Sequence, residues 1–194
     1  MKKIILVFSL LISFIAFSQE KEENKFKYQQ DIGKKHEIKL NAFNLIALSA
    51  LDVSYEKLIS PNSSYGVALF YNFSDLEDDI VFDKRFSLTP FYRWFFSETR
   101  YARGFFVEGF GMLNTYNEDY YDFDHNNNTS KHVSNNQTAF ALGISVGGKF
   151  VTKQGFTTEV YLGIGRNLIK SDNDDDFFDT DVVGRFGISL GYRF

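Results

Sequence analysis

From Ile38 to the end of the chain, hydrophobic and polar residues alternate with a period of two. In the clearest segment, at the C-terminus, one face of the alternation consists of large apolar residues: Phe186, Ile188, Leu190, Tyr192 and Phe194. Residues 85–96 and 138–150 repeat the scheme. A period of two is typical of β-strands, and no window of eleven or more residues has a persuasive helical face. The pattern predicts an all-β domain.

Eight segments of this kind follow one another: Ile38–Ala47, Ala50–Ile59, Ser64–Phe73, Arg85–Phe96, Gly104–Tyr116, Thr138–Phe150, Phe156–Asn167 and Val182–Phe194. Each is close to, or slightly above, the roughly 9 to 11 tilted residues with which a strand crosses a bilayer. We therefore expect an eight-stranded antiparallel up-and-down transmembrane β-barrel over residues 38–194.

The lengths of the connections support this expectation. After a short first connection near Leu48 and Ser49, long and short connections alternate. The long ones are Ser74–Lys84, Asn117–Gln137 and Leu168–Asp181, and the short ones are Ser60–Ser63, Ser97–Arg103 and Val151–Gly155. Short turns at one end and long loops at the other are typical of outer-membrane barrels.

A soluble lipocalin-like barrel is an alternative with the same number of strands. Its bulky apolar residues would face the interior. In this chain the bulky face is rich in aromatic residues, while the opposite face carries glycine, alanine, serine and charges. Small residues suit the narrow interior of eight strands and bulky ones suit lipid, so the membrane barrel is favoured.

The N-terminus has the pattern of a secretory signal. Two lysines precede an apolar run, Ile4–Phe17, and the small residues Ala16 and Ser18 mark a cleavage site. The 14 residues of the run are fewer than the roughly 20 that a membrane-spanning helix needs. We expect a signal peptide over residues 1–18, a solvated periplasmic leader over residues 19–37, and export to the outer membrane of a Gram-negative bacterium.

Composition narrows the possible chemistry. The chain has no cysteine, which excludes disulfides, a thiol nucleophile and a cysteine zinc site, and its three histidines offer little for a metal site. The formal net charge of −4 does not favour a nucleic-acid partner. No cofactor is expected.

Taken literally, the alternation points eight charged residues into the barrel: Lys39, Glu56, Arg93, Glu108, Lys149, Glu159, Arg185 and Arg193. Charges in a lumen of low dielectric constant need partners. Spacing from the turns places Arg93 opposite Glu108 and Lys39 near Glu56. This predicts an ion-pair network that fills the lumen as a plug. The alternative is a selective pore, which the small interior of eight strands disfavours.

The three long loops carry 15 of the 25 acidic residues: Asp75, Glu77, Asp78, Asp79, Asp83, Glu118, Asp119, Asp122, Asp124, Asp172, Asp174, Asp175, Asp176, Asp179 and Asp181. We expect a solvated extracellular surface, with divalent cations as candidate partners. An EF-hand site is not expected at Asp172–Asp176, because Phe177 and Val183 replace the glycine and the bidentate glutamate.

The middle long loop also holds the residue types of a serine hydrolase: Asp124, His125, Ser130, His132 and Ser134. Such a pair of serine and histidine could act on lipid. Five asparagines make this loop a poor frame for the positional precision that catalysis needs, so no enzyme activity is expected.

The terminal sequence Gly191–Phe194, preceded by apolar residues at every second position, resembles the signal that outer-membrane barrels present to the barrel assembly machinery. Other segments resemble small eight-stranded barrels of the outer-membrane protein A type: Ile38–Asn41, Val53–Glu56, Pro90–Arg93, Gly104–Phe106, Leu142–Gly143 and Gly163–Gly165. The chain is most similar to an uncharacterised group of such barrels often found without a partner domain.

This resemblance implies outer-membrane lipid and the assembly machinery as partners. It also implies a non-enzymatic structural role or a role in surface contact. Porin-like function as a narrow pore, or transport of a small molecule or lipid, is the alternative; a lipid-modifying enzyme is less favoured.

Overall fold

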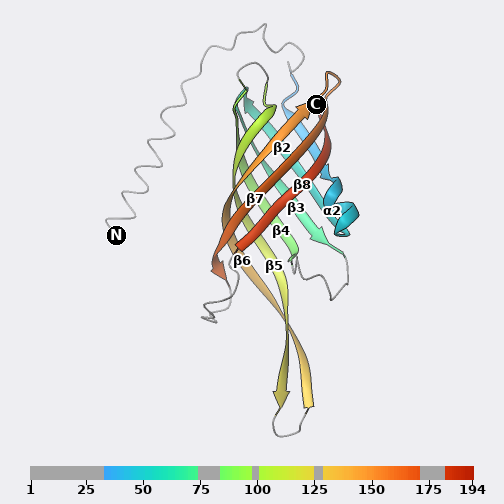
Figure 1. Ribbon diagram of the computed structural model, residues 1–194, viewed down its shortest axis with the longest axis vertical. Coiled ribbons are helices and arrows are strands. Elements are labelled where there is room, and N and C mark those ends of the chain that lie inside the picture. Colours follow the sequence, from blue (N-terminus) through green and yellow to red (C-terminus); the bar gives the residue numbers. More distant parts are fainter. Residues whose placement is uncertain (1–32, 74–83, 98–100, 125–128, 171–181) are drawn as a thin grey trace, which may run out of the picture.

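A computed structural model describes residues 33–73, 84–97, 101–124, 129–170 and 182–194. Each strand is antiparallel to its neighbours in sequence, and the last pairs with the first to close a barrel (Figure 1). The strands are β1 (His36–Asn41), β2 (Ala50–Ser60), β3 (Ser63–Asn72), β4 (Lys84–Phe95), β5 (Gly104–Asp124), β6 (Thr129–Val151), β7 (Phe156–Lys170) and β8 (Val182–Arg193). The predicted eight-stranded up-and-down barrel is confirmed.

The two ends of the barrel differ. At the turn end, at the top of Figure 1, short connections join β2 to β3, β4 to β5 and β6 to β7. The backbones of His36 and Phe194 also pair there. The nitrogen of His36 lies 3.0 Å from the carbonyl oxygen of Phe194, and the nitrogen of Phe194 lies 2.8 Å from the carbonyl oxygen of His36. We call the opposite end, where β1 leads into β2, the loop end.

The first connection contains a short helix that the alternation did not predict. The expected strand Ile38–Ala47 ends at Asn41, and α2 (Ala42–Ala47) follows. The Asn41 side chain accepts a hydrogen bond from the backbone N–H of Asn44 at 3.3 Å, which caps the helix. Six residues are too few for a helical period to stand out in the sequence. Among the described residues, no helix is long and apolar enough to cross a membrane.

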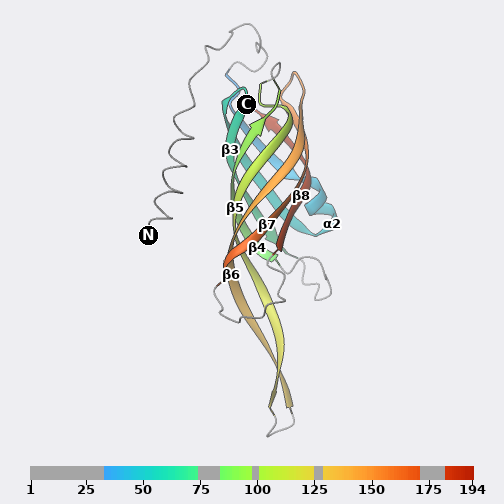
Figure 2. The same ribbon diagram turned by 60° about the vertical axis from the view of Figure 1, so that its left-hand side comes forward.

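The expected loop Asn117–Gln137 was also wrong. β5 and β6 stay paired as far as Asp124 and Thr129, and both views show the ribbon that they form extending beyond the barrel at the loop end (Figures 1 and 2). The residues of this ribbon are mostly polar. Beyond Tyr116 and Ala139 neither strand pairs with a second neighbour among the described residues, so no sheet face imposes an apolar alternation that the sequence could show. The other two long loops lie mostly outside the described residues.

The alternation separates the two faces of the barrel wall. On β4, Trp94 is 59% exposed on the outer face, whereas its neighbours Arg93 and Phe95 are buried inside. Among the described residues, 31 large hydrophobic side chains are exposed.

The interior holds more aromatic rings than the small-residue pattern suggested. Each of several rings lies over a glycine of the adjacent strand: Phe106 is the register partner of Gly147, and Phe91 of Gly66. A Cβ atom on Gly147 would lie 2.5 Å from Cζ of Phe106. The glycines therefore make the room in which the interior rings pack.

Candidate functional site

Arg93 is the centre of an ion network in the turn-side half of the lumen. Its Nε donates to Glu108 at 2.7 Å, its Nη1 to both Glu56 and Glu159 at 2.7 Å, and its Nη2 to Glu159 at 2.7 Å. All four side chains are at most 1% exposed. One guanidinium thus holds three carboxylates together, and two of its nitrogens bind Glu159.

Two lysines extend the network toward β1. Lys149 Nζ lies 2.6 Å from Glu56 and 2.8 Å from Glu37. Lys39 Nζ lies 2.8 Å from Glu159 and also pairs with Glu56. Each ammonium group therefore bridges two carboxylates from different strands.

Hydroxyl groups and a second guanidinium complete the coordination of the carboxylates. Ser64 donates to Glu56 at 2.5 Å and Ser145 donates to Glu108 at 2.9 Å. Arg185 of β8 also pairs with Glu108. The buried carboxylates thus have charged and neutral donors together, as burial of a charge requires.

The structure brings the eight inward-facing charged residues of the sequence analysis into this one network, and Arg185, at 7% exposure, is the most accessible of them. Arg93 and Glu108 are direct register partners. The structure adds two further buried carboxylates: Glu37 binds Lys149 and Arg193, whereas Asp52 is hydrogen-bonded to the side-chain amides of Asn41 and Asn44.

The sequence analysis missed these two residues for different reasons. Glu37 was assigned to the solvated leader, but β1 begins at His36 and Glu37 is fully buried. Asp52 lies four residues before Glu56 on β2, so the same alternation places both side chains on the inner face, and continuing it from Glu56 toward the start of the strand predicts Asp52.

Residues of the β4–β5 connection are buried at the turn end of the lumen. Arg193 donates to the backbone carbonyls of Tyr101 and Ala102 at 3.0 and 2.8 Å, while its Nε binds Glu37 at 2.7 Å. The N–H of Ala102 donates to the carbonyl of Pro61 at 2.7 Å. Tyr101 and Ala102 also join an apolar cluster whose other members are Leu58, Phe95, Phe106 and Tyr161.

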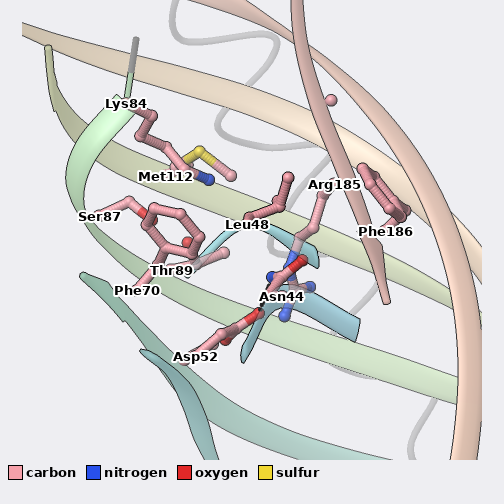
Figure 3. A pocket seen from close by; sticks show the side chains of 12 residues that line it. Asn44, Leu48, Asp52, Phe70, Lys84, Ser87, Thr89, Met112, Arg185 and Phe186 are labelled. Carbon is pink, nitrogen blue, oxygen red and sulfur yellow. Dashed lines mark hydrogen bonds between the residues drawn. The ribbon is translucent and has the colours of Figure 1, made fainter. Parts of the chain in front are cut away.

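A small cavity lies in the loop-side half of the lumen (Figure 3). Asp52 accepts hydrogen bonds from the side-chain amides of Asn41 and Asn44 at 2.9 and 2.7 Å. Across the cavity, the Lys84 ammonium lies 4.2 Å from the centroid of the Phe70 ring. The cavity volume of about 20 Å³ accommodates water but no organic ligand.

The other predicted chemistry falls on residues about which the structure says little. Two of the acidic loops, with Asp75–Asp83 and Asp172–Asp181, lie outside the described residues, as does His125. The side chains of Glu118–Asp124 and of Ser130, His132 and Ser134 are likewise outside the described part. In the part of the chain that is described, no group of three or more histidine, aspartate or glutamate residues is placed to hold a metal ion.

A family model described as a protein of unknown function (DUF3575) matches residues 7–177. The chain belongs to this family. No match was found among curated proteins or among solved structures. The region matched by DUF3575 includes Arg93 and the four glutamates of the network, whereas Arg185 and Arg193 of β8 lie beyond it.

Proposed function

We propose that this member of DUF3575 is an integral outer-membrane barrel of the outer-membrane protein A-like type. The observation that carries the proposal is the inverted distribution of side chains, with large hydrophobic residues outside and a paired charge network inside. A water-soluble barrel would expose the polar face and bury the apolar one. Lipid around the wall accounts for the exposed apolar belt.

The lumen is sealed in this proposal and the protein is non-enzymatic. Arg93 and its partners fill the middle of the barrel, and Tyr101 and Ala102 close the turn end. The cavity lined by Asp52 and Lys84 in the loop-side half has room only for water. The role is then support of the membrane or contact with material at the cell surface.

In outer-membrane barrels the short turns face the periplasm and the long loops face the cell exterior. In the proposed orientation the loop end therefore faces outward, and the β5–β6 ribbon is the part suited to surface contact. It carries Glu118, Asp119, Asp122 and Asp124 beyond the barrel wall. Divalent cations shared with anionic lipid are candidate partners for these carboxylates and for those of the neighbouring loops.

Two further parts of the proposal concern biogenesis. Residues 1–18 act as a signal peptide for export. Phe186, Ile188, Leu190, Tyr192 and Phe194 on the outer face of β8 form the signal read by the barrel assembly machinery; the last four of these side chains are exposed.

The single tryptophan provides the test. Trp94 lies on the outer face of β4, and in vesicles of brominated phosphatidylcholine we expect its fluorescence to be strongly quenched relative to unbrominated vesicles. The double variant Trp94→Phe/Phe95→Trp is the matched control, since it moves the indole one position along, into the lumen. Folded, reconstituted protein whose Trp94 is no more quenched than the control would refute the membrane barrel.

Conductance across a planar bilayer separates a sealed lumen from the porin-like alternative. The packed network predicts no steady single-channel current at neutral pH. A stable open level in the unmodified protein would instead establish a pore and rule out the plug.

A further inference from the structure

The turn end of the barrel carries a groove that the proposed function does not use. It lies beside the β6–β7 turn, has a volume of about 260 Å³, and is lined by residues that include Arg103, Phe150, Thr152, Phe156 and Thr158. This volume is more than ten times that of the cavity in the loop-side half of the lumen. It is large enough for the headgroup of a lipid.

Cations from three parts of the chain gather around this turn. Arg103, at the start of β5, donates through Nη1 to the carbonyl of Val151 at 3.1 Å. Lys34, which precedes β1, donates to the carbonyl of Gln154 at 3.2 Å. Lys153 is exposed in the turn itself, next to Thr152, which lines the groove. The described residues that line the groove carry no carboxylate side chain, and of their two cations Lys149 pairs with Glu37 and Glu56 in the lumen. With Arg103 in the lining and Lys153 on the adjacent turn, the electrostatic potential of the groove favours an anion.

The groove also has an apolar side. Phe150 and Phe156 are 68% and 46% exposed and flank the turn on the outer face of β6 and β7. Between them, the Thr152 hydroxyl accepts a hydrogen bond from the N–H of Phe156 at 3.0 Å, and its own proton can be donated to a ligand. A groove lined by a cation and by exposed aromatic rings matches a molecule with an anionic head and an apolar tail.

We propose that this groove binds an anionic phospholipid, with the phosphodiester near Arg103, Lys153 and Thr152 and the acyl chains against Phe150 and Phe156. The inference rests on the proposed function, because a membrane barrel with the loop end outside places the turn end at the periplasmic leaflet. The charge asymmetry of the chain fits this arrangement, since the acidic residues concentrate in the loops at the opposite end.

Native mass spectrometry of the purified barrel in detergent, with phosphatidylglycerol or phosphatidylcholine added, tests the proposal. We expect retained phosphatidylglycerol to exceed phosphatidylcholine. Lys153→Gln should lower the apparent affinity for phosphatidylglycerol about fivefold, as expected for one cation at an anionic lipid surface. Arg103→Gln should lower it at least as much, and Phe150→Ser should weaken binding of both lipids.

Lys57→Gln is the matched control, because Lys57 is also an exposed lysine at the turn end but lies on β2, away from the β6–β7 turn that borders the groove. Equal losses in Lys57→Gln and Lys153→Gln, or equal retention of the two lipids by the unmodified protein, would overturn the site. Competition by millimolar glycerol 3-phosphate would overturn it as well, by showing that a free phosphate suffices. Arg103 is buried and its loss can disturb folding, whereas Lys153 is exposed and keeps the test decisive.

The outcome is separable from that of the membrane proposal. Binding in detergent does not require a bilayer, so selective lipid retention with an unquenched Trp94 would refute the membrane barrel and leave the groove intact. Quenching of Trp94 without selective retention of phosphatidylglycerol would support the membrane barrel and refute the lipid site in the groove.

Discussion

The two halves of the lumen arrange their polar groups in different ways. In the turn-side half, Arg93, Lys149 and Lys39 each contact at least two carboxylates. In the loop-side half, Asp52 is held by two neutral amides beside a water-sized cavity. Water can replace a lost partner at the cavity, whereas the carboxylates around Arg93 are at most 1% exposed and are bound directly by the guanidinium. The halves should therefore respond very differently to the loss of one side chain.

Arg93→Met should produce the largest effect. It leaves Glu56, Glu108 and Glu159 buried with one fewer cation, and breaking a buried pair by removing one partner costs about 3 to 5 kcal/mol. The free energy of unfolding in urea, measured in lipid, should fall by at least this amount. Asp52→Asn in the loop-side half is the contrasting variant, and an equal loss there would abolish the distinction between the halves.

A double-mutant cycle with Glu108 sharpens the same comparison. Glu108→Ala alone removes one of the three carboxylates that bind the buried guanidinium of Arg93. The effects of Glu108→Ala and Arg93→Met on the free energy of unfolding should therefore be strongly non-additive. The double variant should still be clearly less stable than the unmodified protein, since Arg93 also forms ion pairs with Glu56 and Glu159. Simple additivity would mean that the two side chains do not share a site.

Gly147→Ala tests the packing of the turn-side half without altering a charge. The new Cβ would meet Cζ of Phe106 at 2.5 Å and the carbonyl oxygen of Val160 at 2.6 Å, and overpacking of this kind costs about 1 to 3 kcal/mol. Gly148→Ala is the matched control, because nothing lies within 4 Å of its added Cβ. Equal stability of the two variants in urea would show that the Phe106 ring does not pack against Gly147 inside the barrel.

Asn44→Ala should have the smallest effect. It removes one donor to Asp52 and leaves Asn41 and the adjacent cavity, so we expect a loss of about 0.5 to 1.5 kcal/mol. Leu45→Ala, on the exposed side of α2, controls for changes in the helix itself. A loss as large as that of Arg93→Met would show that the loop-side half is also a dry network.

The alternation of inward and outward residues along each strand made most of this architecture predictable. Strand number, inward charges and the pairing of Arg93 with Glu108 all depend on a period of two, which persists wherever one face of a strand lines a packed interior and the other lies on the outside of the barrel. The features that were missed lie where this condition ends. α2 is too short to show a period, the β5–β6 ribbon runs past the strands on either side of it, and Tyr101 and Ala102 are buried by a turn rather than by a strand.

The seam between β1 and β8 has a consequence for the order in which the chain becomes native. Glu37 and Arg193 are 156 residues apart, and Arg185 of β8 also supplies a cation to Glu108. Until β8 docks, the interior therefore lacks two of its cations and both terminal strands keep an open hydrogen-bonding edge. Contacts between such distant segments form late, because closing a long loop is entropically costly. The last strand thus completes the wall and supplies the last two cations of the network in one step, which makes an unfinished barrel electrostatically distinguishable from a finished one.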